Sequence, residues 1–130
     1  MSVWKVQCDE NKKPWGSVID IPTPFGMNGK VIHMDAGKRT SLKYYKHKNQ
    51  ALYCFAGSVS VSAPYEHEFG DEITDAHGAT FTLKPGSLIL IQAGNVYRVK
   101  ALEDSVLVEV LLGTHSDDFV MLADDYGRVR

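Results

Sequence analysis

The sequence predicts an all-β domain, and three observations support this. Short runs rich in Val, Ile, Leu, Tyr and Phe recur along the chain. Turn residues separate these runs, as at Asn28-Gly29, Pro85-Gly86 and Gly94-Asn95. No segment keeps a helical period over three turns. Short strands at regular spacing indicate a β-sandwich or barrel, and 130 residues predict one domain over residues 1–130.

The expected strands follow one another through the chain. In order they are KVIHM (30–34), ALYCF (51–55), SVSVS (58–62), FTL (81–83), SLILIQ (87–92), VYRV (96–99) and SVLVEVLL (105–112). The polar segment around residues 63–80 is the longest insertion between them. The tail, residues 115–130, is expected to pack as a short helix or strand.

Composition narrows the class of protein. Hydrophobic residues make up 44% and charged residues 23%, as in ordinary globular proteins, and the formal net charge is −2. The basic stretch at 43–48 is too short for a nucleic-acid footprint. The first residues lack the apolar core of a signal peptide, and no apolar run reaches the roughly 20 residues of a membrane span. Cys8 and Cys54 do not predict a disulfide scaffold, so we expect a cytoplasmic protein.

The first of two spaced motifs lies in SLKYYKHKNQ (41–50). Tyr45 and His47 are two residues apart, and residues i and i+2 of a strand point to the same face. Both are therefore expected to line one cavity. Gln50 follows three positions after His47, and Gly57 follows Gln50 after six intervening residues. The spacing is typical of a metal-binding strand, although Tyr and Gln are not ligands that a divalent metal prefers.

The second motif begins at Gly86. Five residues separate it from Gln92, and Gly94 comes two positions later. Tyr97 follows after two further residues and Ala101 after three more. This places a second phenol at a fixed distance from a glycine turn, in a region expected to form strands.

Together the two motifs resemble those of a cupin. The cupin pattern has His-x-His, a Glu and a Gly in its first motif, and Gly, Pro-x-Gly, His and Asn in its second. Gly57, Gly86 and Gly94 all fall in place, whereas Gly37 lies two residues too early for the Gly that opens the first motif. The resemblance implies a single cupin, which is a double-stranded β-helix or jelly-roll-like barrel. It also implies a homodimer, for which ALYCF and VEVLL would supply the interface.

A narrower resemblance covers nearly the whole chain. The sequence is similar to the cupin domain of bacterial mannose-6-phosphate isomerase/mannose-1-phosphate guanylyltransferase proteins. The segments that carry this likeness are KPWGS (13–17), SLKYYKHKNQ (41–50), GNVYRVKA (94–101) and VEVLLGTHSDDFVMLADDYGR (108–128). It implies a carbohydrate-related isomerase activity.

The positions of the metal ligands in that family have largely changed here. Tyr45, Gln50 and Tyr97 replace His, Glu and His, Lys43 replaces a Gln, and only His47 is kept. Free tyrosine has a pKa of about 10 and is therefore a neutral phenol at pH 7. A Lys43 ammonium would repel a cation. We therefore predict no metal and no other cofactor. A weakly bound metal, or Fe³⁺ held by two tyrosinates, stays open as an alternative.

The remaining side chains predict a small-molecule site. As catalytic residues we assign His47, acting as acid/base, with Tyr45 and Tyr97 as proton donors. As substrate-binding residues we assign Lys43, Gln50 and Gln92, and we expect a sugar-derived ligand such as a sugar phosphate or nucleotide sugar. Metal-free cupin ketoisomerases acting on nucleotide-linked deoxysugars are a second, fainter resemblance, echoed by His47-Lys48 and 50–54.

Two readings of this site stay open. In the first, the protein is a metal-free, isomerase-like enzyme. In the second, it is a non-catalytic cupin that binds a carbohydrate or small organic anion as a sensor or accessory module. His47 would then be a barrel-lining residue, and Tyr45 and Tyr97 would fill the barrel mouth.

Overall fold

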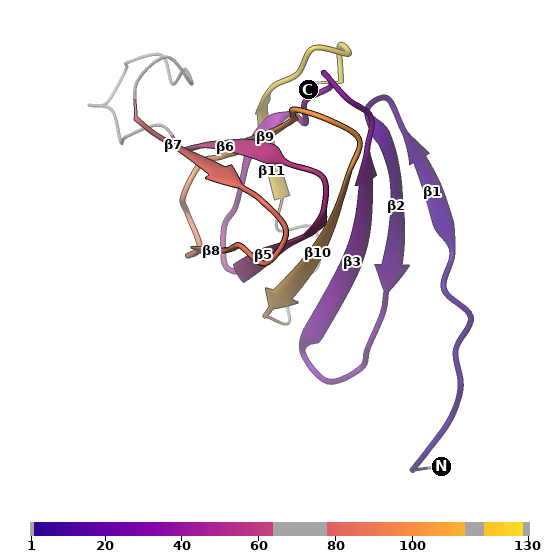
Figure 1. Ribbon diagram of the computed structural model, residues 1–130. Helices are drawn as coiled ribbons and strands as arrows, with labels where there is room; N and C mark the ends of the chain where they lie inside the picture. The colour runs from indigo at the N-terminus through magenta and orange to yellow at the C-terminus, as the bar shows by residue number, and fades with distance from the viewer. Residues whose placement is uncertain (1, 64–77, 114–118, 129–130) are drawn as a thin grey trace.

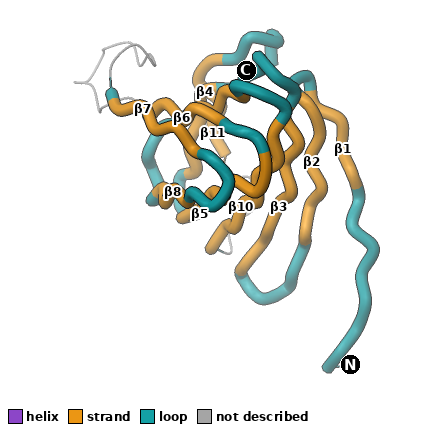
Figure 2. Tube along the Cα trace, viewed as in Figure 1, coloured by secondary structure: helices purple, strands orange, loops and turns teal. Residues whose placement is uncertain are grey.

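The computed structural model describes residues 2–63, 78–113 and 119–128. Within these residues all regular secondary structure is β-strand, as Figure 2 shows. The strands are β1 (Glu10–Lys13), β2 (Gly16–Ile21), β3 (Met27–Met34), β4 (Leu42–Tyr45), β5 (Asn49–Ala56), β6 (Val59–Ala63), β7 (Ala79–Leu83), β8 (Leu88–Ile91), β9 (Arg98–Ala101), β10 (Ser105–Leu112) and β11 (Phe119–Ala123). The all-β prediction is confirmed.

The strands form one large sheet and two small ones. The large sheet has the order β1-β2-β3-β10-β5-β8, and the small sheets have the orders β11-β4 and β7-β6-β9. Every pairing is antiparallel. Isolated bridges at Lys43–Tyr97 and Arg39–Lys100 join the segment around β4 to that around β9. The two small sheets therefore act as one layer, which lies against the large sheet (Figure 1).

All seven strands expected from the sequence are present, within a few residues of the expected ends. The structure adds a hairpin of β1 and β2, in which Lys13 pairs with Gly16 across Pro14 and Trp15. β1 is polar and exposed along its whole length, so no alternation could reveal it. The tail forms β11, a strand rather than a helix. The insertion around 63–80 falls mostly outside the described residues.

The glycine of the first motif makes the turn between β5 and β6. Gly57 has φ of +80°, and a Cβ atom there would lie 2.3 Å from the Asp104 carbonyl oxygen. No L side chain fits such a position without strain. Gly86, at the start of the second motif, has φ of +95° in the turn before β8. The motif spacing thus reflects two turns that need glycine.

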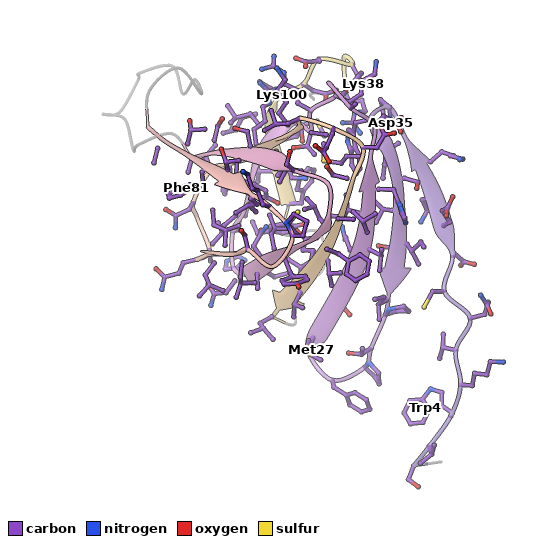
Figure 3. The ribbon with its side chains drawn as sticks, in the orientation of Figure 1. Trp4, Met27, Asp35, Lys38, Phe81 and Lys100 are labelled. Atoms are coloured by element: carbon purple, nitrogen blue, oxygen red, sulfur yellow. The ribbon has the colours of Figure 1, made fainter. Side chains whose placement is uncertain are left out.

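The core lies between the two layers. Val59, Val61 and Cys54 are fully buried in it, and Trp15 joins them from the β1–β2 hairpin. Along β10, residues alternate between the inner face of the large sheet, which borders the core, and the outer face, which looks away from it. Figure 3 shows Met27 at one end of this sheet and Asp35, Lys38 and Lys100 at the opposite end of the barrel.

Candidate functional site

A cavity of about 530 Å³ lies between the inner face of the large sheet and the β4–β11 pair. Its size is within the range of small-molecule sites. Apolar side chains such as Ile32, Leu52 and Leu107 line much of it. The charged side chains that line it are Lys13, Asp20, Lys30, Lys43, Lys48, Glu109 and Arg128.

Lys43 is placed in the cavity by the register of three strands. Its N–H donates to the Tyr97 carbonyl at 3.0 Å, and the Tyr97 N–H donates back at 2.8 Å. On its other side Lys43 is opposite Met121 of β11. Residues directly opposite in an antiparallel pair project to the same face. All three side chains consequently line the cavity, and Lys43 Nζ lies 5.5 Å from the centre of the Tyr97 ring.

The facing wall carries a row of alternating charges. Glu109 on β10 is opposite Lys30 on β3, and Lys30 is opposite Asp20 on β2. All three line the cavity. Glu109 is only 2% exposed, and Gln50 Nε2 donates a hydrogen bond to its Oε1 at 3.2 Å. The cavity therefore holds a buried carboxyl between a cation and an amide donor.

Burial shifts the pKa of Lys43. The pKa of Lys43 is lowered to about 8; desolvation is the main cause, and the nearby charges of Lys30, Arg128 and Lys13 act in the same direction. The Glu109 carboxylate acts in the opposite direction. At pH 7 about a tenth of Lys43 is therefore neutral amine, and the rest is ammonium.

The pKa values of Glu109 and Tyr97, which line the cavity together with Lys43, are raised rather than lowered. Burial raises the pKa of Glu109, while the charges of Lys43 and Lys30 lower it. Burial and the Glu109 charge raise the pKa of Tyr97 well above its ordinary value. Tyr97 is thus a neutral phenol, and Glu109 is a carboxyl whose affinity for a proton exceeds that of an ordinary glutamate.

Two ion pairs fix the tail beside the cavity. Arg128 donates to both oxygens of Asp124, with Nη2 at 2.9 Å from Oδ1 and Nε at 3.0 Å from Oδ2. Arg39 donates to Asp125 from Nε at 2.5 Å and from Nη2 at 2.7 Å. Arg39 does not line the cavity.

Four of the six predicted site residues are brought together. Lys43, Tyr45 and Tyr97 line the cavity, and Gln50 lies behind it against Glu109. Tyr45 also packs its ring against Phe119 at 5.8 Å between centroids. The same-face argument holds for Lys43 and Tyr45, which are two residues apart in β4.

The structure places His47 and Gln92 elsewhere. β4 ends at Tyr45, and His47 is an exposed residue in the bend that follows. The assumption that the strand continues to His47 is therefore wrong, and with it the expectation that His47 lines the cavity. Gln92 is exposed in the turn after β8, where its carbonyl accepts from Asn95. Neither side chain borders the cavity.

Glu109 was missed at the sequence level. It is the one charged residue within SVLVEVLL, and its position has the same parity as Leu107 and Leu111, which are buried. A carboxyl on the buried side of a strand usually has a partner or a function. That signal was available, but the outward and inward sides of this strand could not be told apart while both were apolar.

A divalent metal does not fit the donors that this cavity offers. Within the described ranges no three His, Cys, Asp or Glu side chains are grouped closely enough to hold a metal ion. At the cavity Glu109 is a carboxylate donor, but the Lys43 ammonium stands near it and Tyr97 favours the neutral phenol. Zn²⁺ and Fe²⁺ prefer several imidazole or carboxylate ligands. No chemical step below is therefore routed through a metal.

Comparison with known proteins shows the fold. No protein-family model matches the chain, and no curated protein matches it in sequence. Among solved structures, the capsular polysaccharide assembling protein CapF from Staphylococcus aureus has a TM-score of 0.72 at 16% identity, over 92% of this chain and 33% of that one. KdgF from a Halomonas species has a TM-score of 0.63 at 16% identity, over 84% of this chain and 89% of that one.

A third neighbour agrees with these two. Oxalate decarboxylase from Bacillus subtilis has a TM-score of 0.72 at 15% identity, covering 88% of this chain and 30% of that one. The chain spans about a third of the length of CapF. The protein has the cupin fold, a double-stranded β-helix, as the two spaced motifs predicted. The narrower likeness to mannose-6-phosphate isomerase stays a prediction.

No described residue lies in a helix long and apolar enough to cross a membrane.

Proposed function

We propose that this cupin-fold protein binds a small, anionic, hydroxyl-bearing molecule in its cavity, of the class of sugar phosphates and nucleotide sugars, without a conventional divalent metal. The observation that carries the proposal is the charge of the cavity. Five cationic side chains and two carboxylates line it, although the chain as a whole has a net charge of −2. A positive cleft with apolar walls concentrates anions.

The polar groups in the cavity suit a sugar as well as a phosphate. Lys30 and Lys43 approach from opposite walls and provide charge for a phosphate. The hydroxyls of Tyr45 and Tyr97 are hydrogen-bond donors and acceptors for sugar hydroxyls. Among the neighbours, one is named as a capsular polysaccharide assembling protein and another as an oxalate decarboxylase. Both a carbohydrate-derived ligand and a small organic anion are compatible with those names.

An isomerase-like activity would use Glu109 and Tyr97 rather than His47. Moving a carbonyl along a sugar requires a base that takes a proton from one carbon and an acid that supplies one to oxygen. Glu109 is a buried carboxyl with a raised pKa, and Tyr97 is a neutral phenol beside it. The second candidate is a binding module, and a turnover assay on each bound sugar separates the two.

A thermal-shift screen tests the binding proposal. The panel pairs each sugar phosphate with its neutral sugar and adds nucleotide sugars and simple organic anions. We expect phosphorylated compounds to raise Tm and neutral sugars to leave it unchanged. The double variant Lys30→Gln/Lys43→Gln is expected to weaken binding by roughly a hundredfold, from the loss of two charge-assisted contacts.

The matched control is Lys46→Gln. Lys46 is exposed and lies outside the cavity lining, so the same change of charge there should leave binding intact. If Lys46→Gln weakens binding as much as the cavity variant, then net charge rather than the cavity explains the effect and the proposal is wrong. An equal response to neutral and phosphorylated sugars would also contradict it.

We further propose that two copies pair through the outer face of the large sheet. Three side chains on that face are strongly exposed: Leu90 is 72% exposed, Phe55 65% and Leu88 56%. Tyr53 lies between them on β5, opposite Leu88. The strands ALYCF and VEVLL both contribute to this face. Monomeric proteins rarely expose apolar patches of this kind. The part of the face that β5, β8 and β10 form carries no charged side chain, so it can meet its own copy without repulsion.

The cytoplasmic location inferred from composition remains part of this proposal.

A further inference from the structure

Lys43 combines features that its predicted role as an anion-binding cation does not require. We propose that Lys43 is a nucleophilic amine that forms a Schiff base with the carbonyl group of an anionic aldehyde or ketone bound in the cavity. The inference rests on the proposed function, because it uses the same cavity and narrows the ligand class to carbonyl compounds. It assigns Lys43 a covalent role.

The position of the amine is fixed on several sides. Nζ lies 5.5 Å from the centroid of the Tyr97 ring and 5.5 Å from that of the Phe119 ring. The backbone of Lys43 is hydrogen-bonded to Tyr97 in both directions, so the side chain starts from a rigid strand pair. Lys43 lines the cavity and is only half-buried, which leaves its amine open to a bound ligand.

The surroundings of Lys43 favour the neutral amine. Amines are activated as nucleophiles by desolvation in an apolar pocket or by a neighbouring cation, and Lys43 has both. The pKa of Lys43 is lowered from 10.5 to about 8, chiefly by desolvation, with Lys30, Arg128 and Lys13 contributing in the same direction. At pH 7 this raises the neutral fraction on the order of a hundredfold over an ordinary lysine.

The chemistry balances with groups already present. The Nζ lone pair attacks the carbonyl carbon, the C–N bond forms, and the carbonyl oxygen takes a proton to give a carbinolamine. A further proton converts the hydroxyl to water, which leaves to give the protonated imine, so the net change is neutral amine, carbonyl and one proton to protonated imine and water. Glu109, a carboxyl with a raised pKa that lines the same cavity, is the group that would carry protons to and from that oxygen, and the neutral Tyr97 hydroxyl would donate a hydrogen bond to it.

Reductive trapping tests the inference on the full chain. Pyridoxal 5′-phosphate is the probe, because it is an anionic aldehyde, and cyanoborohydride fixes any imine as a stable amine. Peptide mapping by mass spectrometry then locates the adduct. We expect Lys43 to be labelled at least about tenfold faster than exposed Lys46 at pH 7. We also expect inorganic phosphate to suppress labelling at Lys43 and not at Lys46.

The matched variants are Lys43→Arg and Lys46→Arg. Both keep a positive charge, and arginine forms no Schiff base under these conditions because it stays protonated. Lys43→Arg should lose the fast, phosphate-sensitive adduct, while Lys46→Arg should retain it. If Lys43→Arg does not fold, the peptide map of the unaltered protein still decides the question.

Two measurements on the unaltered protein separate this inference from the proposed function. Binding is read from the rise in Tm with inorganic phosphate, and covalent chemistry from the adduct map. Even labelling of the exposed lysines together with a phosphate-induced rise in Tm would overturn the Schiff base and leave the binding proposal standing. Even labelling without any effect of phosphate would overturn both.

Discussion

Both faces of the large sheet depart from the usual distribution of polarity, because the largely apolar inner face also carries charges and part of the outer face is apolar and exposed. On β10 the inner face carries Leu107, Glu109 and Leu111, and next to Glu109 the inner face also holds Lys30 and Asp20. On β10, β5 and β8 the outer face carries apolar and aromatic side chains, among them Ala51, Tyr53, Phe55, Leu88, Leu90, Val106, Val108 and Val110, while Glu10 and Lys12 of β1 lie on the same face at the far edge of the sheet. Antiparallel sheets commonly place apolar residues inside and polar residues outside.

Both proposals rest on this distribution of charged and apolar side chains. Charged groups on an inner face raise the free energy of the folded state unless they are paired with one another or with a ligand. Exposed apolar groups on an outer face favour association. We therefore propose the inner face as the ligand site and the outer face as the site where a second copy pairs. Each assignment can be disturbed without touching the other.

The largest expected effect is on the outer face. Leu90→Lys places a charge at the most exposed apolar position of that face, so pairing would bury an unpaired ammonium. We expect the dimer to dissociate, with a dissociation constant raised by about a hundredfold or more. Analytical ultracentrifugation measures this, and ligand binding should be unchanged in the separated monomers.

The matched control for that variant is Leu102→Lys. Leu102 is 51% exposed but follows β9, away from the large sheet. It should leave the dimer intact. A protein that is monomeric before any substitution, or one in which both variants dissociate equally, would break the assignment of the outer face.

The next effect is on stability and concerns the inner face. Lys43→Met removes a partly desolvated ammonium and keeps an apolar stem among Tyr97 and Phe119. We expect the free energy of unfolding at pH 7 to rise by about 1–3 kcal/mol, while anion binding weakens. Chemical denaturation measures the first and the phosphate-induced Tm shift the second. A less stable variant would show that the ammonium stabilises the fold.

The pH dependence of stability gives an independent check on Lys43. The pKa of Lys43 is about 8 in the folded chain and 10.5 without these surroundings. Between these values the unfolded chain binds a proton that the folded chain has lost, so the stability due to this group rises with pH. Lys43→Met should lack that rise from pH 8 upward, and equal slopes in the two proteins would contradict the assigned shift.

The fold was predictable because its signals are local. Gly57 and Gly86 stand where the backbone needs positive φ, and such turns keep their spacing when the residues around them change. The alternating strands between the turns carried their own signal. The β1–β2 hairpin carried no such signal, because β1 is polar and exposed along its whole length and joins the sheet through its pairing with β2.

The site was less predictable because it depends on where strands end and on which strands face each other. Tyr45 and His47 share a face only if β4 continues, and it stops at Tyr45. Glu109 lies 66 residues from Lys43 in the chain, and the two share a cavity only through the packing of the layers. No local pattern reports such a contact, so the main acid of the cavity was absent from the prediction.

A smaller effect concerns the pH profile of Lys43 labelling. Glu109 raises the pKa of Lys43, and Lys30 lowers it. Glu109→Gln should therefore move the midpoint of labelling below about 8, and Lys30→Gln should move it above that value. Rates of reductive trapping between pH 6 and 10 give these midpoints. Shifts in the same direction would show that the inner row of charges does not act on Lys43.

The smallest expected effect is that of a chelator. Asp20 and Glu109 are the two acidic side chains that line the cavity within the described residues, and the ammonium of Lys43 competes with any cation for Glu109. Treatment with EDTA should then leave both Tm and the response to phosphate unchanged, whereas removing a structural metal typically destabilises a protein strongly. Elemental analysis of the purified protein is the matching measurement. Near-stoichiometric iron, zinc or manganese that EDTA removes together with ligand binding would assign the inner face to a metal. The assignment of Lys43 as the group that binds the ligand would then be wrong.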